Sequence, residues 1–138
     1  MAQGHDFKAF PELSNSQLQF YYFESPHKQM VEPFDAKVIR VIDGDTIKVR
    51  VPDRDFDFPI RFARTAAPEL DEQGGPKSQK FLESELLNQD VHIELATSRV
   101  GKFGRLLGEV THFGRNMNDL TLDLGYAIKF EDIQNGFS

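Results

Sequence analysis

Apolar and polar residues alternate in the first half of the chain in a way that predicts three consecutive β-strands. The run from Val38 to Ile42 is mostly apolar and has the length of a strand, and alternation with period two follows at 47–51 and at 58–62. Turn-forming residues lie between these runs, at 43–45 and at 52–55. The pattern therefore predicts a meander of three strands with short connections.

A helix and two further strands are predicted in the second half of the chain. Pro76 follows two glycines, where proline favours the first turn of a helix, and the apolar residues of 81–87 have helical spacing. Apolar residues alternate again at 91–95 and at 107–111, which is typical of strands. The sheet is therefore predicted to have strands from both halves of the chain.

A short last helix is expected near Asn118 to Leu124, with Asn118 as its cap and Gly125 as its left-handed stop. The order of elements is then β-β-β-α-β-β-α, which indicates a β-rich α+β fold in a single domain. We expect the chain to divide into an N-terminal extension at 1–35, the folded domain at 36–130 and a C-terminal tail at 131–138.

The extension has one conspicuous feature, an aromatic run from Phe20 to Phe23 between polar and proline-containing stretches. Two interpretations stay open. The run forms a short strand buried against the chain's own domain, or it docks on a protein partner or a second copy of the chain.

The composition excludes several classes of protein. Hydrophobic residues make up 39% of the 138 residues and include 13 Phe, which is enough for a packed core and too many for a disordered chain. No apolar run approaches the roughly 18 residues that a membrane span needs. No signal peptide is visible, so we expect a cytoplasmic or particle-associated protein with no membrane partner. The absence of Cys excludes disulfides, thiol catalysis and Cys-based zinc sites.

The net charge of −6 lies in the flanks of the chain. Between Lys37 and Arg115 there are 13 basic and 13 acidic residues, so the predicted domain is neutral. Neutrality allows a local phosphate-binding site but does not indicate broad electrostatic attraction of nucleic acid.

Two carboxylates and a hydroxyl lie in the predicted turn Asp43-Gly44-Asp45-Thr46. Oxygen ligands at a sharp turn suit a hard divalent cation such as Ca²⁺ or Mg²⁺. Asp-Gly is also among the commonest hairpin turns, so a plain turn is the alternative.

Arginines belong to the two other polar clusters. Arg61 lies on the third predicted strand, shortly before Glu69, and Arg105 ends the cluster Lys102-Phe103-Gly104-Arg105. A guanidinium offers a planar fork of donors that matches phosphate oxygens. Taken singly, Arg61 is more simply explained as a solvent-facing charge, and the cluster at 102–105 as a hairpin corner.

Taken together, in this order and spacing, the three clusters resemble those of the staphylococcal nuclease (thermonuclease-like) family. The resemblance is carried by Val41 to Val49, by Ile60-Arg61 leading to Ala67-Pro68-Glu69, by Lys102 to Leu107, and by Met117 through Ala127. It covers about residues 36 to 130 and implies a five-stranded OB-type barrel with two packed helices.

The family hydrolyses phosphodiester bonds in DNA and RNA with bound Ca²⁺, so the resemblance implies a nuclease that uses Ca²⁺ or another divalent cation. By position, Asp45 would ligate the metal, Asp43 would hold a metal-bound water, and Ala67 would offer its backbone carbonyl. Glu69 would orient or deprotonate the attacking water.

The resemblance also implies a set of groups that hold the substrate. Arg61 and Arg105 would clamp the phosphate and stabilise the charge that develops in the transition state. Lys102 and Phe103 would contact the nucleic acid.

One departure from the family pattern bears on activity. The family usually has Asp, sometimes Asn, as a metal ligand five residues after the arginine, and this position is Ala66 here. A methyl group cannot ligate a cation. The resemblance therefore leaves two hypotheses, a nuclease with a weakened metal site, or a catalytically degenerate barrel that serves as a binding or structural component of a larger assembly or particle.

Overall fold

The first three strands of the fold form the expected meander. The computed structural model describes residues 6–7, 10–14, 17, 21, 24, 29–52, 54–100 and 106–130, with the backbone alone at 97–100. In the meander, β1 (Phe34–Asp43) pairs antiparallel with β2 (Thr46–Arg50), and β2 pairs antiparallel with β3 (Phe58–Phe62). Asp43 is the last residue of β1, and the other turn-forming residues predicted at 43–45 and 52–55 fall between these strands.

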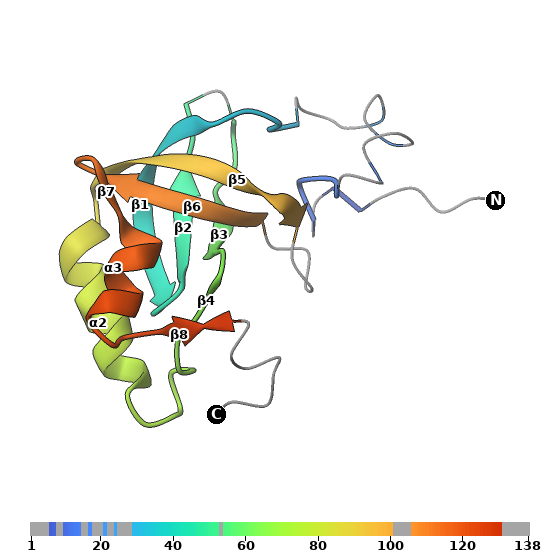
Figure 1. Ribbon diagram of the computed structural model, residues 1–138. Helices are drawn as coiled ribbons and strands as arrows, with labels where there is room; N and C mark the ends of the chain where they lie inside the picture. The colour runs from blue at the N-terminus through green and yellow to red at the C-terminus, as the bar shows by residue number, and fades with distance from the viewer. Residues whose placement is uncertain are drawn as a thin grey trace.

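Two further strands close the sheet into a barrel (Figure 1). β5 (Asp90–Val100) pairs with β1, and β6 (Leu106–His112) pairs with β5. Parallel pairing of β6 with β3 completes the circle. The expected β-rich α+β fold with an OB-type barrel of five strands is therefore confirmed.

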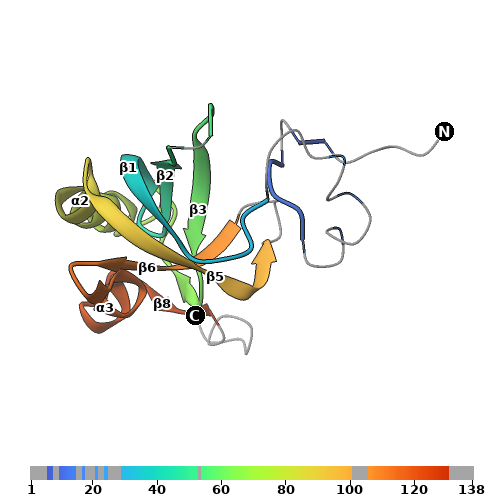
Figure 2. The same ribbon diagram turned by 90° about the horizontal axis from the view of Figure 1, so that it is seen from above.

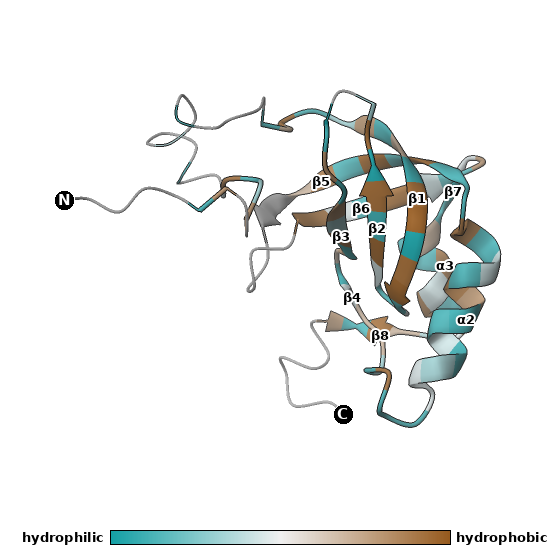
Figure 3. Cartoon of the chain, turned by 180° about the vertical axis from the view of Figure 1, so that it is seen from behind, coloured by the Kyte–Doolittle hydropathy of each residue, from teal (hydrophilic) through white to brown (hydrophobic). Residues whose placement is uncertain are grey.

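The alternation along the strands separates the interior of the barrel from its surface. Every second side chain of β3 is buried. Burial also alternates along most of β1 and β2, except at the register shifts at Ile39 and Ile42 and at the start of β2, where Thr46 and Ile47 are both buried. Figure 3 shows these strands side by side with alternating apolar and polar segments. The interior is filled by branched and aromatic side chains, among them Val38, Ile47, Ile60 and Phe62, which have no exposed surface.

Two helices pack on the barrel, α2 (Gly75–Leu86) and α3 (Met117–Asp123). Figures 1 and 2 show both on one side, opposite the described N-terminal residues. Leu82 and Leu86 of α2 are fully buried in the core. As predicted, proline lies in the first turn of α2. No helix within the described ranges is long and apolar enough to cross a membrane.

The predicted cap of the last helix is wrong. Asn116 is the cap of α3, and its side chain accepts a hydrogen bond of 2.8 Å from the N–H of Asp119. Asn118 is buried instead, where its amide donates to the carbonyls of Ala63 and Gly108 and accepts from the N–H of Val110. The cap therefore lies two residues before the predicted one, and the Asn118 amide instead binds backbone groups of β6 and of the turn after β3.

Two short ladders complete the fold. β7 (Arg115–Asn116) pairs with β6, and β4 (Thr65–Ala66) pairs with β8 (Ile128–Lys129). Gly125 follows Leu124, the C-cap of α3, and has a φ of 80°, so it is the left-handed stop of the helix that the sequence predicted. After α3, β8 runs alongside β4, which is the strand that follows β3 in the sequence (Figure 1).

Part of the N-terminal extension packs on its own barrel. The side chains of Glu12, Leu13 and Gln29 are buried. Glu12 forms an ion pair with Arg54 in which both side chains are almost fully buried, and it accepts a hydrogen bond of 2.8 Å from the N–H of Met30. Phe20, Tyr22 and Phe23 of the aromatic run lie outside the described residues, as does the tail at 131–138.

Candidate functional site

The Asp43-Gly44-Asp45 turn is a tight and closely packed connection between β1 and β2. The carboxylate of Asp43 accepts a hydrogen bond of 3.0 Å from the N–H of Asp45. A side chain at Gly44 would place Cβ 2.6 Å from that of Ser78 and 2.8 Å from that of Ala67. Only glycine fits there, so the turn lies directly against α2 and the segment that follows β4.

Asp45 connects the first sequence cluster to the second. Its carboxylate is almost fully buried, and Oδ2 accepts a hydrogen bond of 2.9 Å from the N–H of Ala67. The same oxygen lies 3.3 Å from Nη2 of Arg61, and the Thr46 hydroxyl donates to Oδ1 at 3.0 Å. Residues from three separate segments thus meet at one carboxylate.

Arg61 is held in place by the backbone and does not face solvent. Its Nη1 donates to the carbonyls of Phe62, at 2.7 Å, and Thr65, at 2.9 Å. Only 15% of its side chain is exposed, so the simpler interpretation of Arg61 as a solvent-facing charge is wrong. The two carbonyl partners are on the last residue of β3 and the first residue of β4, and they fix the guanidinium next to Asp45.

Burial raises the pKa of Asp45 to about 6. Its loss of solvent is the largest cause, and the neighbouring carboxylate of Asp43 raises the pKa further. The hydrogen bond from Ala67 and the charge of Arg61 act in the opposite direction but do not cancel the shift. Two carboxylates therefore lie close together at this turn, and Arg61 and the Ala67 N–H compensate their negative charge only in part. Such a place favours a bound cation.

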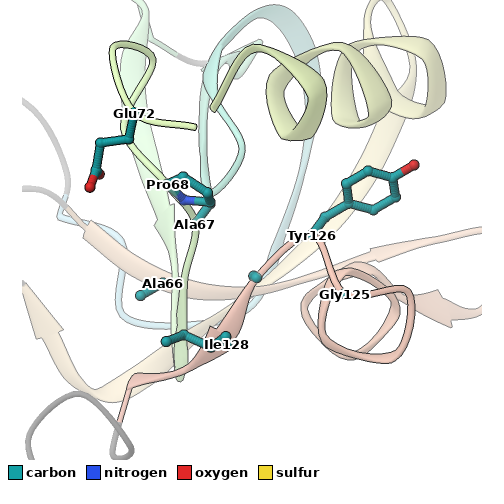
Figure 4. A pocket seen from close by; sticks show the side chains of 8 residues that line it. Ala66, Ala67, Pro68, Glu72, Gly125, Tyr126 and Ile128 are labelled. Carbon is teal, nitrogen blue, oxygen red and sulfur yellow. The ribbon is translucent and has the colours of Figure 1, made fainter. Parts of the chain in front are cut away.

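Ala66 lies beside an apolar neighbour in the β4–β8 ladder. It pairs with Ile128, and Figure 4 shows the two side chains close together. They line a surface pocket of about 260 Å³ formed by Ala66, Ala67, Pro68, Glu72, Gly125, Tyr126, Ala127 and Ile128. Glu72 is the one acidic residue in this set, whereas Ala66 and its strand partner Ile128 have no side-chain oxygen that could bind a cation.

Glu69 lies two residues beyond Ala67, in an exposed position. Its N–H donates a hydrogen bond of 2.8 Å to the carboxylate of Glu72, and its carbonyl accepts from the Glu72 N–H. Within the described residues no three acidic or histidine side chains come together as a metal cluster, so Glu69 does not join Asp43 and Asp45 in one.

The remaining predicted site residues cannot be placed. Arg105, Lys102 and Phe103 lie outside the described residues. β6 begins at Leu106, directly after Arg105, and its Leu107 pairs with Arg61. In the sequence, Arg105 is therefore two residues before Leu107, the strand partner of Arg61.

The oxygen donors of the site fit a hard divalent cation in kind but are few in number. The carboxylates of Asp43 and Asp45 belong to one turn, and the Ala67 peptide contacts Asp45. Ca²⁺ takes about six to eight oxygen ligands, and Ala66 adds none. Water would have to supply the rest, so we expect weak binding.

Two parts of this arrangement were not predicted from the sequence. The Thr65 carbonyl is a backbone group, and no sequence signal identifies it as a partner of Arg61. Arg64 has a φ of 68°, a left-handed conformation, and forms ion pairs with Glu109, at 2.6 Å, and Asp119, at 2.9 Å. These pairs fasten the β3–β4 turn to β6 and α3, but no local pattern marks them.

A scan of the chain against protein-family models finds no match, and neither does a search of curated proteins. The function is therefore argued from the chemistry of the site.

Proposed function

We propose that this chain hydrolyses phosphodiester bonds in DNA or RNA at the Asp45 site, with Ca²⁺ or another divalent cation as cofactor. The observation that supports this most is the contact of Asp45 with both Arg61 and Ala67. It brings a carboxylate, a guanidinium and a backbone peptide together from two separate sequence clusters, as the resemblance to the nuclease family requires.

Asp43, Asp45 and the Ala67 carbonyl are the groups that would hold the cation. When bound, a divalent cation would act as a Lewis acid on the phosphate and offset negative charge that grows during hydrolysis. The pKa of Asp45 is raised mainly by burial and further by the neighbouring Asp43, and a bound cation would favour the charged form of both carboxylates.

Arg61 is the group that would orient the phosphate. A guanidinium has five N–H donors, of which two reach the Phe62 and Thr65 carbonyls and one faces Asp45. Within the described ranges no hydrogen bond engages the two remaining donors, and these would bind the phosphate oxygens. Because the anchoring carbonyls hold the side chain before substrate arrives, little conformational entropy is lost on binding.

Glu69 and Arg105 complete the proposed chemistry. The exposed carboxylate of Glu69 would take a proton from the attacking water, and Glu69 follows Ala67 by two residues on the same segment. Arg105 would add a second positive charge at the phosphate, together with contacts from Lys102 and Phe103.

The proposal is tested by incubating the full chain with plasmid and single-stranded DNA in Ca²⁺, Mg²⁺, Mn²⁺ or EDTA. We expect cleavage that requires a divalent cation and falls at least a hundredfold in Glu69→Ala and Arg105→Ala. Glu85→Ala, a half-buried position of α2 outside the proposed site, is the matched control and should cleave normally. Absence of cleavage with every cation, in the chain as it is and in Ala66→Asp, would refute the proposal.

A second candidate function is favoured by Ala66 and its apolar partner Ile128. A barrel that binds nucleic acid or an assembly partner without hydrolysis does not need a ligand at position 66. In that case cleavage should be absent while binding persists. If the aromatic run at 20–23 mediates assembly, Phe20→Ser/Phe23→Ser should lower the sedimentation coefficient of the full chain; an unchanged coefficient would exclude the run as the interface.

A further inference from the structure

Four cations lie opposite one another in two pairs on β1 and β2. Lys37 is the cross-strand partner of Arg50, and Arg40 is the cross-strand partner of Lys48. Like charges directly opposite each other in a sheet are destabilising, so the fold retains this arrangement at a cost. We call these four residues the basic track.

All members of the basic track lie on the outer face of the barrel. Directly opposed residues of an antiparallel pair share a face, as do alternate residues such as Lys48 and Arg50. Lys37 and Arg40 are three residues apart, but the register shift at Ile39 keeps both on the exposed face of β1. The intervening pairs are buried, Val38 with Val49 and Val41 with Ile47. Figure 3 shows the corresponding polar segments on neighbouring positions of the two strands.

The positive charge of the track is only partly compensated. Arg50 forms a bidentate ion pair with Asp57, at 2.9 and 3.0 Å, and Asp57 also lies within the electrostatic influence of Lys48. Asp90 is the strand partner of Lys37 on the other side. Among the described residues, no carboxylate forms an ion pair with Lys37, Arg40 or Lys48, so unpaired cations remain.

The track leads toward the candidate site. Arg40 and Lys48 are three residues from Asp43 and Asp45, respectively, at the end of the sheet where the turn lies. Thr46, at the start of β2, is the cross-strand partner of Arg61. The two pairs of cations therefore lie one after the other along β2 on one face of the sheet, and Arg61 of the candidate site lies beyond them in the same direction.

We propose that the basic track binds the phosphates of a single nucleic-acid strand that extends away from the candidate site. This inference rests on the proposed function, because it takes the substrate to be nucleic acid. The four cations form a narrow file along one pair of strands, which matches one phosphate backbone. No aromatic side chain belongs to the track, so the contact should be insensitive to sequence and strongly dependent on salt.

The test is the affinity of the full chain for a fluorescently labelled oligothymidylate, measured by anisotropy in EDTA over a range of salt concentrations. Arg40→Gln/Lys48→Gln should raise Kd about tenfold and reduce the slope of log K against log salt by about 1.4, since each phosphate contact on a single strand contributes about 0.7. Lys80→Gln/Arg115→Gln removes the same charge from other elements and should leave both values unchanged.

The outcomes separate this inference from hydrolysis. Binding that is weakened by the track variant, in a chain that cleaves nothing, would support the track and refute the nuclease. Cleavage of DNA by a chain whose track variant binds like the parent would refute the track alone. Absence of oligothymidylate binding would refute the track, and so would an equal effect of the control variant. A poly-glutamate peptide that binds in place of the oligonucleotide would also refute it, because the partner would then be an acidic protein.

Discussion

Oδ2 of Asp45 accepts a hydrogen bond of 2.9 Å from the backbone N–H of Ala67, 22 residues later in the chain. This bond fastens the β1–β2 turn to the segment after β4, and Arg61 lies against the same oxygen. A buried carboxylate that joins two segments affects both stability and the binding of a cation.

The pKa of Asp45 predicts a specific dependence of stability on pH. Because this pKa is raised from 3.8 to about 6, the folded chain binds a proton more readily than the unfolded chain. The stabilisation is fully present below about pH 4 and is lost as the pH rises through about 6, a change of up to about 3 kcal/mol.

This dependence is measured by urea unfolding across the acidic range, with Asp45→Asn as the comparison. The variant has no carboxyl group to titrate at position 45, so the difference in unfolding free energy between the two proteins should change over this interval. A constant difference between pH 4 and pH 7 would contradict the assigned environment of Asp45.

Restoring a carboxylate at position 66 should strengthen cation binding. Ala66→Asp places a third carboxylate next to Ala67, which should lower the Kd for Ca²⁺ about tenfold, or about 1.4 kcal/mol. Isothermal titration calorimetry measures this directly. Ala66→Ser, which adds an uncharged oxygen, is the control. An equal gain in Ca²⁺ affinity in both variants, or no gain in Ala66→Asp, would show that position 66 does not face a cation site.

Arg64 has two opposing effects on stability that can be separated. Its left-handed conformation costs about 1 kcal/mol for a non-glycine residue, while its half-exposed ion pairs with Glu109 and Asp119 return a similar amount. Arg64→Ala should lose the pairs and keep the strain, which lowers the unfolding free energy by about 1 kcal/mol. Arg64→Gly should be close to neutral, and equal losses in both variants would contradict this balance.

Asn118 should matter more to stability than the cap of the same helix. Asn118→Ala removes the hydrogen-bond partners of three buried backbone groups, on Ala63, Gly108 and Val110, which we expect to cost about 3 kcal/mol or more. Asn116→Ala removes the cap and should cost about 1 kcal/mol. Chemical denaturation checks both, and a smaller loss for Asn118 than for Asn116 would be the opposite of the expected order.

Local patterns predicted the elements of the barrel but not the contacts between distant segments. The alternation at 47–51 and 58–62 gave the strands their positions because one face of each is buried. The parallel pairing of Ile60 with Leu106 joins segments far apart in sequence, and no local period specifies it. The resemblance to the nuclease family implied a closed barrel of five strands but did not specify this pairing.

The same distinction applies to the candidate site. Asp43, Asp45 and Arg61 were identified from residue type and spacing, and the structure brings them together. The orientation of Arg61 was not predictable, because its partners are carbonyl groups that every residue has. The sequence predicts Asn118 as a helix cap for a related reason. A capping asparagine and a buried asparagine near the start of a helix have the same local sequence.

Hydrolysis of a single-stranded oligonucleotide is the most direct test of the proposed activity. The measurement is the single-turnover rate at a Ca²⁺ or Mn²⁺ concentration well below saturation, compared between the chain as it is and Ala66→Asp, with EDTA as the blank. We expect cation-dependent cleavage by the chain as it is, and a rate at least about tenfold higher after Ala66→Asp because the cation is held more firmly. No cleavage above the EDTA blank by either protein would contradict a phosphodiesterase site at Asp45.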